Sequence, residues 1–475
     1  MSTVSGADQP PVSSQTSGTP QLARRRLPST LVTPNPKPTL RPVPTREDAA
    51  ALDAADILAP FRDRFVVSDP KLVYLDGNSL GRLPKATVER LGRVATEEWG
   101  GGLVRSWESW LDRAQEVGDR LGTTFLGARP GETAIADSTT VNLFKLASAA
   151  LDAQLTRRGG RKRCVIVSDR ANFPTDRYVL ESLAARHPAA VLDLIETDPL
   201  TGPTPSDVDA AAARNLAGGR RLALVTFSHV DYRSGAVADQ AAVTERAHAH
   251  GALTLWDESH AVGAIPVDLT AAQVDLAVGC TYKYLNGGPG SPAFLWVRTR
   301  HLEGGTALRQ PVWGWFGQRE QFVMGQGYDP APGITSFLSG TPPILALAGV
   351  DEGVKLSAEA GILALRAKSL SLTDLAIVLH DAWLAPLGTT LGTPRDDARR
   401  GSHLAVHHPA AWGISRALIE DYGVIPDFRA PDVVRLGMTP LYTTHTDVWE
   451  AMQRFRRVLA TERYRAHTAS PRRVT

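Results

Sequence analysis

Short apolar runs recur along the middle of the chain, and the segments between them have the pattern of amphipathic helices. The five clearest runs are RCVIVS (163–168), RLALVTFS (221–228), ALTLW (252–256), VDLAVG (274–279) and AFLWV (293–297). Strands that are apolar on both faces are typical of a parallel sheet covered by helices on both sides. Residues 238–251, between the second and third runs, have the pattern of a crossover helix. The sequence therefore predicts an α/β fold with a mostly parallel sheet.

The chain is predicted to divide into four parts. Residues 1–45 are rich in Pro, Ser and Thr and have few large apolar side chains, so we expect a disordered tail. Residues 46–75 begin with a helical pattern and are expected to pack with the C-terminal part. Residues 76–342 form the predicted large domain. Residues 343–475 form a smaller α/β domain, with a helical region at 343–385, a helix near 410–421, a strand at 433–437 and a final helix near 446–462.

The overall charge gives no sign of a large anionic partner. The chain has 52 Lys and Arg residues against 50 Asp and Glu residues, without the basic excess of proteins that bind nucleic acid or anionic membranes. Its two cysteines, Cys164 and Cys280, exclude a disulfide framework and a cysteine-rich metal site and favour a reducing compartment. No apolar stretch reaches the length of a membrane span. We therefore expect a cytoplasmic protein without a metal, whose partners are small molecules.

Two polar residues follow predicted strands and are one strand–helix–strand unit apart. Asp257 comes directly after ALTLW, and Lys283 follows VDLAVG, 26 residues further along. Because the carboxyl ends of parallel strands meet at one edge, both residues are expected to line one cleft. A carboxylate can pair with a cationic ring nitrogen, and a partly desolvated lysine can form a Schiff base, so the pair indicates a pyridoxal phosphate site. Taken singly, a helix cap is the simpler explanation of Asp257, and a surface position that of Lys283.

Two further polar clusters also follow strands or precede helices. Asp137, Ser138 and Thr139 precede an apolar-faced helix, and their side chains and the free amides of its first turn can form an anion site. Phe173 and Asp176 follow the run at 163–168 and can supply a stacking face and an acceptor for a ring substituent. Helix capping and core packing are the alternative explanations.

Ten segments resemble the kynureninase family in order and spacing. They are YLDGNSLG (74–81), RSW (105–107), STTVNLFK (138–145), NFPTD (172–176), SHVDYRSG (228–235), WDESHAVGAIPVDL (256–269), GCTYKYLNGGPGSPAFLWV (279–297), GWFG (314–317), GTPPIL (340–345) and DFRAPDVVRLGMTPLYT (427–443). The resemblance implies the aspartate-aminotransferase fold (fold type I), with a mostly parallel seven-stranded sheet between helices and a smaller α/β C-terminal domain. It also implies a homodimer that uses pyridoxal 5'-phosphate to hydrolyse L-kynurenine, in tryptophan catabolism, to anthranilate and L-alanine.

The resemblance implies a role for each matching residue. Lys283 would be the Schiff-base lysine, Asp257 the partner of the pyridinium nitrogen, and Tyr282 the residue that handles protons at the alanine end. The other residues around the cofactor would be Ser138, Thr139, Thr140, Phe173, Asp176, Ser234, His260 and, from the second subunit, Trp315 and Thr341. The substrate would be held by Arg435 at its α-carboxylate and by Trp107 and Phe316 at its aryl group, with Asn142 and Tyr74 as further candidates.

Three positions depart from the family pattern. Gln318 follows GWFG where the family usually has His, so a titratable group is missing near the aryl ketone. Glu258 follows the cofactor aspartate where a small or apolar residue is usual. Because side chains alternate along a strand, we expect Glu258 to point away from the ring and to be structural or salt-bridged. Pro426 stands where Gly is common.

These departures leave other functions open. Trp107 and Thr341 resemble the residues of bacterial kynureninases that prefer kynurenine itself, which implies kynurenine as substrate, with the ring-hydroxylated form as an alternative. A second alternative is a kynureninase-like enzyme that uses the same carbanion chemistry on another γ-keto or functionalised amino acid in a specialised pathway. A transaminase or a cysteine desulfurase fits less well, because neither cysteine lies in a predicted exposed loop. A non-catalytic cofactor binder would not need the carboxylate-binding Arg435.

Overall fold

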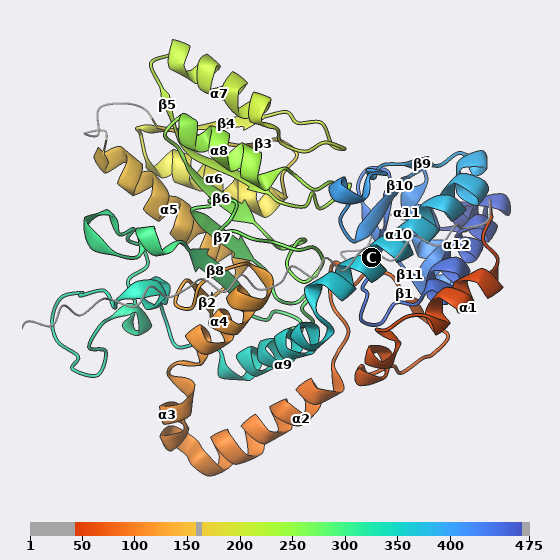
Figure 1. Ribbon diagram of the computed structural model, residues 1–475, viewed down its shortest axis with the longest axis horizontal. Helices are drawn as coiled ribbons and strands as arrows, with labels where there is room; N and C mark the ends of the chain where they lie inside the picture. Colours follow the sequence, from red (N-terminus) through yellow and green to blue (C-terminus); the bar gives the residue numbers. More distant parts are fainter. Residues whose placement is uncertain (1–42, 158–163, 468–475) are drawn as a thin grey trace, which may run out of the picture. The chain divides into compact units, whose positions relative to one another are not determined.

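The computed structural model describes residues 43–157 and 164–467 (Figure 1). The predicted disordered tail lies outside these residues, apart from its last three positions. The described residues belong to one compact unit, which contains two main β-sheets. The predicted boundaries at residues 75 and 342 fall inside this unit and stay predictions.

The larger sheet has seven strands, as expected for this fold class. Their spatial order is β2 (Thr133–Ala136), β8 (Ala293–Val297), β7 (Leu276–Gly279), β6 (Leu253–Asp257), β5 (Arg221–Ser228), β3 (Cys164–Asp169) and β4 (Ala190–Ile195). Strand β8 runs antiparallel to β2 and β7, and the other neighbouring pairs are parallel. The five apolar runs correspond to β3, β5, β6, β7 and β8, which confirms the mostly parallel sheet.

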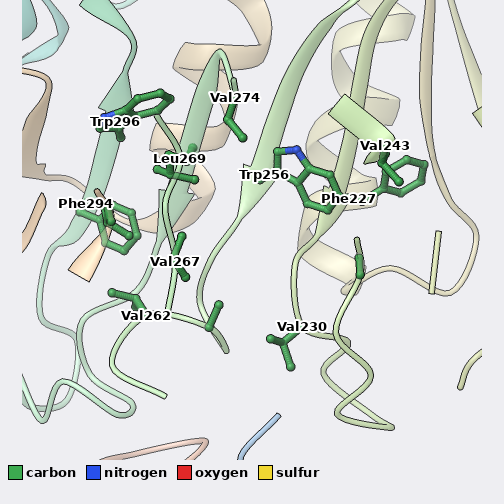
Figure 2. Close-up of a cluster of buried hydrophobic side chains, with 14 of the residues drawn as sticks. Phe227, Val230, Val243, Trp256, Val262, Val267, Leu269, Val274, Phe294 and Trp296 are labelled. Carbon is green, nitrogen blue, oxygen red and sulfur yellow. The ribbon is translucent and has the colours of Figure 1, made fainter. Parts of the chain in front are cut away.

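Helices cover both faces of this sheet. One face packs against α4 (Arg113–Phe125), α7 (Pro205–Ala217), α8 (Gln240–Ala249) and α9 (Ile344–Ala360). The other face packs against α5 (Thr139–Arg157) and α6 (Pro174–Arg186). Figure 2 shows part of the first of these cores, where Trp256 and Trp296 are almost completely buried. Burial of each such side chain contributes roughly 2–3 kcal/mol, so the apolar runs hold the strand ends in fixed positions.

The smaller sheet is antiparallel and lies in the C-terminal part of the chain. Its strands are β12 (Asp427–Arg429), β13 (Val433–Gly437), β10 (His403–His407) and β9 (Thr390–Leu391), in that order. Helices α10 (Ile362–Leu379), α11 (Ala411–Tyr422) and α12 (His445–Ala460) pack against it. The helical region predicted at 343–385 is two main helices, because Gly361 has a φ of +78° and ends α9. α9 therefore packs in the core of the larger sheet and α10 in that of the smaller one.

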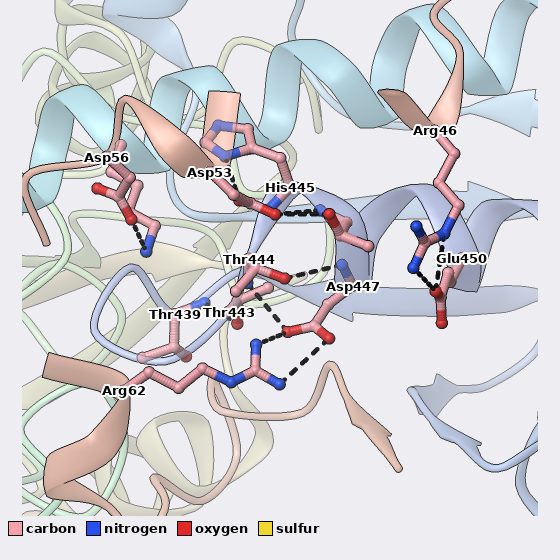
Figure 3. Close-up of polar contacts among 12 residues, drawn as sticks. Arg46, Asp53, Asp56, Arg62, Thr439, Thr443, Thr444, His445, Asp447 and Glu450 are labelled. Carbon is pink, nitrogen blue, oxygen red and sulfur yellow. Dashed lines mark hydrogen bonds and ion pairs between the residues drawn. The ribbon is translucent and has the colours of Figure 1, made fainter. Parts of the chain in front are cut away.

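The N-terminal segment also contacts the C-terminal elements. Residues 46–75 contain α1 (Arg46–Ala54) and β1 (Val73–Tyr74), and they are followed by α2 (Lys85–Arg93) and α3 (Trp107–Trp110). Strand β1 pairs in parallel with β11 (Val424–Ile425), and α1 packs against α12. Figure 3 shows the polar contacts at this junction, where Asp53 of α1 accepts hydrogen bonds from His445 and Thr446. Within the described ranges, no helix is long and apolar enough to span a membrane.

Candidate active site

The carboxyl ends of β2, β3, β5, β6 and β7 lie at the same edge of the larger sheet, together with the start of β8. This arrangement follows from the strand directions given above. A cavity of about 780 Å³ opens at this edge. Eleven of the predicted site residues line it: Ser138, Thr139, Thr140, Phe173, Asp176, Asp257, His260, Tyr282, Lys283, Thr341 and Arg435.

Lys283 and His260 are in direct contact inside the cavity. Lys283 follows the end of β7, and its Nζ lies 2.9 Å from His260 Nε2. Burial, and then the positive charge of Lys283, hold the pKa of His260 well below its usual range. The imidazole is therefore neutral at physiological pH, and one of its nitrogens can accept a hydrogen bond.

Two buried carboxyl groups face the same space. Asp257 ends β6, and its Oδ1 accepts a hydrogen bond from the Ser259 backbone N–H at 2.7 Å. Burial raises the pKa of Asp257, although the charge of Lys283 opposes this. Burial, and then the charge of Asp257, raise the pKa of Asp176 well above its usual range. Two carboxyl groups so placed favour a bound proton or a cationic ligand, and a protonated pyridine nitrogen meets that requirement.

The N-terminus of α5 lies at one end of the cavity, where it offers groups that can bind an anion. Ser138 and Thr140 are exposed there, and the first backbone amides of a helix have no partner within it. Asp137, directly before them, has a φ of +47° and pairs with the buried Lys145, whose Nζ lies 2.7 Å from Asp137 Oδ2. This ion pair neutralises the carboxylate next to the helix N-terminus, so it does not repel a phosphate.

An aromatic side chain closes one side of the cavity. Phe173 precedes α6, contacts Tyr232 edge-to-face with ring centroids 5.3 Å apart, and keeps 36% of its surface exposed. A planar ring bound between the anion-binding end and the two carboxyl groups can stack on this exposed aromatic face. The hydroxyls, carboxyl groups, lysine and aromatic face together fit pyridoxal phosphate.

Arg435 lies at another side of the cavity, on the smaller sheet. It is almost fully buried on β13, in register with Asp427 of β12, with which it forms an ion pair. Burial, and then the charge of Asp427, raise the pKa of the neighbouring Asp76 to about 6. The cavity thus has a cationic end supplied by a sheet different from the one that carries Lys283.

Four predicted residues lie outside the cavity lining. The Ser234 hydroxyl bonds Asp231 Oδ1 at 2.8 Å and lines a neighbouring cavity of about 540 Å³. Trp107 and Phe316 contact each other, with ring centroids 6.1 Å apart. Trp315 is 43% exposed. In contrast, Thr341, which the resemblance places at the site of the second subunit, lines the cavity of its own chain.

The two further candidates, Asn142 and Tyr74, and the three positions that depart from the family pattern have defined contacts or positions. Asn142 donates to the Ala136 carbonyl, and the Tyr74 hydroxyl donates to the Leu80 carbonyl. Glu258 is fully buried and bonded to His229 Nδ1 at 2.7 Å and to Gln240 Nε2 at 2.5 Å, so it points into the core as expected. Gln318 accepts a hydrogen bond from the Asp329 backbone and does not appear in the lining, and Pro426 lies between β11 and β12.

Several lining residues were not singled out from the sequence. Asn78, Ser79, Tyr232 and Arg429 lie within segments that carried the resemblance, but nothing in their local pattern indicated a site. His403 of β10 is not part of the lining, but it is fully buried and its ring contacts that of His260, with centroids 5.3 Å apart. Only the folded chain brings these residues together, since Arg435 and Ser79 are 356 positions apart.

Comparisons with known proteins show which families the chain is similar to. Residues 365–455 match the family described as kynureninase C-terminal domain, and residues 147–407 match aminotransferase class-V. The chain is 46% identical to a kynureninase of Pseudomonas fluorescens over 411 residues, covering 86% of this chain and 94% of that one. It is 44% identical to a kynureninase of Burkholderia pseudomallei over 424 residues, covering 89% and 97%.

Solved structures of low sequence identity show the same fold. A cysteine desulfurase from Thermococcus onnurineus NA1 superposes with a TM-score of 0.69 at 17% identity, covering 85% of this chain and 98% of that one. A C-DES mutant with glycine covalently linked to its PLP cofactor gives a TM-score of 0.68 at 16% identity, covering 87% and 99%. These structures confirm the fold class.

Proposed function

The chain belongs to the kynureninase family, and we propose that it uses pyridoxal 5'-phosphate to hydrolyse the Cβ–Cγ bond of L-kynurenine to anthranilate and L-alanine. The observation that carries this proposal is the 46% identity to a kynureninase along almost the whole of that enzyme. The enzyme class is a hydrolase that acts on carbon–carbon bonds in ketonic substances. The cavity at the edge of the larger sheet is the site that we assign to it.

The residues of the cavity suggest how the cofactor is held. Ser138, Thr139 and Thr140 with the first amides of α5 would bind the phosphate, and Phe173 would stack on the ring. Asp257 would pair with the ring nitrogen, with Asp176 beside it. When bound, the cofactor supplies an electron sink that stabilises a carbanion on the substrate.

The chain's own groups can move the protons of the reaction. Lys283 would bind the cofactor covalently and, once the substrate amine has replaced it, would take the proton from the substrate Cα. Neutral His260, 2.9 Å from Lys283 Nζ, would keep that amine oriented. Cys280, and then burial, raise the pKa of Tyr282, so its phenol stays protonated and can donate a proton to the alanine fragment.

We also propose a homodimer in the cytoplasm. Trp313, Trp315, Phe322 and Met324 are between 43% and 78% exposed within one short segment, an arrangement that supports a covered interface. In a dimer, this segment would bring Trp315 to the partner's site. Sedimentation of the purified protein should therefore give twice the chain mass, and a stable monomer would contradict the shared site. Both cysteines are buried and neither forms a disulfide, which is compatible with a reducing compartment.

The direct test is product formation by the purified, cofactor-loaded protein. We expect L-kynurenine to give anthranilate, followed by its fluorescence, and an equal amount of alanine, followed by mass spectrometry. The same assay with 3-hydroxykynurenine shows whether the enzyme prefers the unsubstituted or the hydroxylated aryl group. If amino acids change the cofactor absorbance but neither substrate is cleaved, the proposed substrate is wrong and another γ-keto amino acid must be sought.

A further inference from the structure

Two arginines at the cationic end of the cavity share one aspartate. Asp427 Oδ2 pairs with Arg435 Nη2 and also accepts a hydrogen bond from Arg429 Nε at 2.9 Å, and Arg429 Nη2 forms an ion pair with it at 2.8 Å. Asp427 and Arg435 are nearly fully buried, whereas the side chain of Arg429 keeps 33% of its surface exposed. Both arginines line the cavity. Asp427 therefore bridges a buried guanidinium and a more accessible one.

The hydrogen bonds of Arg435 leave little room for a substrate carboxylate. Its Nη2 donates to Asp427 and to Ser79 Oγ at 2.8 Å, and its Nη1 donates to the Tyr232 carbonyl at 2.5 Å. Asn78 accepts from Nε at 2.7 Å when its amide oxygen faces the guanidinium. These bonds occupy four of the five N–H groups of the guanidinium. Bidentate binding of a carboxylate needs two N–H groups. Arg435 must therefore first release one of its hydrogen bonds within the chain.

Among the partners of Arg435, Asp427 is the one whose replacement by a substrate carboxylate costs the least free energy. Its negative charge resembles that of a substrate carboxylate, so exchange leaves the buried Arg435 paired with an anion throughout. Asp427 itself stays paired, because its two contacts with Arg429 do not involve Arg435. Ser79, Tyr232 and Asn78, in contrast, offer neutral oxygens, so exchange of one of them for a carboxylate would not keep the charge around Arg435 constant.

We propose that Asp427 is an exchangeable counter-ion: the α-carboxylate of the amino-acid substrate displaces it from Arg435, while Arg429 retains it. This inference rests on the proposed function for the nature of the substrate. It makes Arg429 and Asp427 positioning residues, which set how strongly the enzyme prefers ligands that carry an α-carboxylate. A neutral ligand cannot replace Asp427 and gains nothing from Arg435.

A double-mutant cycle with a binding readout tests the exchange. The cofactor absorbance of the holoenzyme is titrated with L-alanine and, separately, with L-alaninamide, which lacks the carboxylate. Asp427→Asn removes the competing charge, so we expect the Kd of L-alanine to fall about threefold or more. Arg429→Gln leaves Asp427 held by Arg435 alone, so we expect the Kd of L-alanine to rise about tenfold. The Kd of L-alaninamide should change by less than twofold in both variants.

The double variant separates exchange from simple attraction between charges. Without Asp427 there is nothing for Arg429 to retain, so Arg429→Gln should change the Kd of L-alanine less than twofold in the Asp427→Asn background. Independent charge effects would instead be additive, and additivity would overturn the proposal. Weaker L-alanine binding in Asp427→Asn would also overturn it, because Asp427 would then only position Arg435.

Controls keep the result independent of folding and of the proposed reaction. Asp421→Asn is the matched control, since Asp421 pairs with Arg463 on the surface. If Asp427→Asn does not fold, the Arg429→Gln variant alone tests the exchange. An unchanged Kd of L-alanine in Arg429→Gln would contradict it. If the wild type forms no anthranilate but the cycle is non-additive, the proposed function fails and the exchange stands. If anthranilate forms and the cycle is additive, the exchange alone fails.

Discussion

Removal of the Asp53 carboxylate tests how the N-terminal helix is held on the C-terminal part of the chain (Figure 3). Asp53 Oδ1 accepts from the His445 backbone N–H at 2.7 Å and from His445 Nδ1 at 2.9 Å. Asp53 Oδ2 accepts from the Thr446 backbone N–H at 2.9 Å and from its hydroxyl at 2.6 Å. The carboxylate thus satisfies two of the free amides at the start of α12.

The size of the effect follows from the pKa of Asp53. Burial alone would raise this pKa, but the hydrogen bonds from His445 and Thr446 outweigh burial and lower it to about 2. A fall from the ordinary value of 3.8 corresponds to roughly 2 kcal/mol of stabilisation of the charged form. Because 21% of the side chain is exposed, solvent weakens this contribution. We therefore expect Asp53→Ala to lower the free energy of unfolding by roughly 1–2 kcal/mol at pH 7.

Hydrogen exchange measured by mass spectrometry reports this loss where it occurs. In Asp53→Ala, the peptides that cover α1 and the start of α12 should exchange roughly 5–30 times faster, as expected for a loss of 1–2 kcal/mol. Peptides from α5 should not change, nor should any peptide in Asp63→Ala, which alters an exposed aspartate of the same segment. Unchanged exchange in α1 would refute the assignment of Asp53 as the anchor.

The pH dependence of this contact has a definite sign. Because the pKa of Asp53 is lowered in the folded protein, its contribution is complete above about pH 4 and is lost as the pH falls toward 2. The difference between the urea midpoints of the wild type and Asp53→Ala should therefore shrink between pH 6 and pH 3. A difference that stays constant would show that a contact other than the carboxylate holds α1.

Three further changes probe the cavity and its surroundings. Lys283→Ala should abolish the visible absorbance of the lysine-bound cofactor, and a variant that keeps this absorbance would contradict the role of Lys283. The pKa of Asp76 is raised to about 6 by burial and then by Asp427, so stability should fall as the pH rises from about 4 to 6. Asp76→Asn should remove this fall in thermal unfolding at pH 4.5 and 7.5. Glu258→Ala leaves the buried His229 without its partner and should cost about 3 kcal/mol in denaturant unfolding, with an unchanged Kd for L-alanine.

Strands with continuous apolar runs were predictable, and strands that are half-exposed or whose apolar run is interrupted on both sides by polar residues were not. β5, β6, β7 and β8 are buried on both faces along most of their length, so their sequences are mostly apolar. β4 at the sheet edge is mostly half-buried and contains Asp193, which hides the pattern. In β2, the apolar run is the three residues AIA, and Thr133 and Asp137 flank it on both sides. The break between α9 and α10 depends on a single residue, Gly361, inside a sequence that is otherwise helical on both sides.

The candidate site was predictable where function depends on position after a strand. Asp257 and Lys283 line one cavity, as their separation by one strand–helix–strand unit indicated. Ser234 did not follow this rule, because its hydroxyl and backbone are used in a local turn with Asp231. The bridge from Arg435 to Asp427 and Arg429 had no local signal, since it depends on the register of β12 and β13.

The cavity takes its two ends from two different sheets. The groups assigned to the cofactor follow strands of the seven-stranded sheet, whereas Arg435, Arg429 and Asp427 belong to the four-stranded one. Mutations in the smaller sheet can therefore change which ligand charge is accepted without altering the lysine and carboxylates that the chemistry requires. Evolution and engineering can diversify substrate choice on one sheet while selection preserves reactivity on the other.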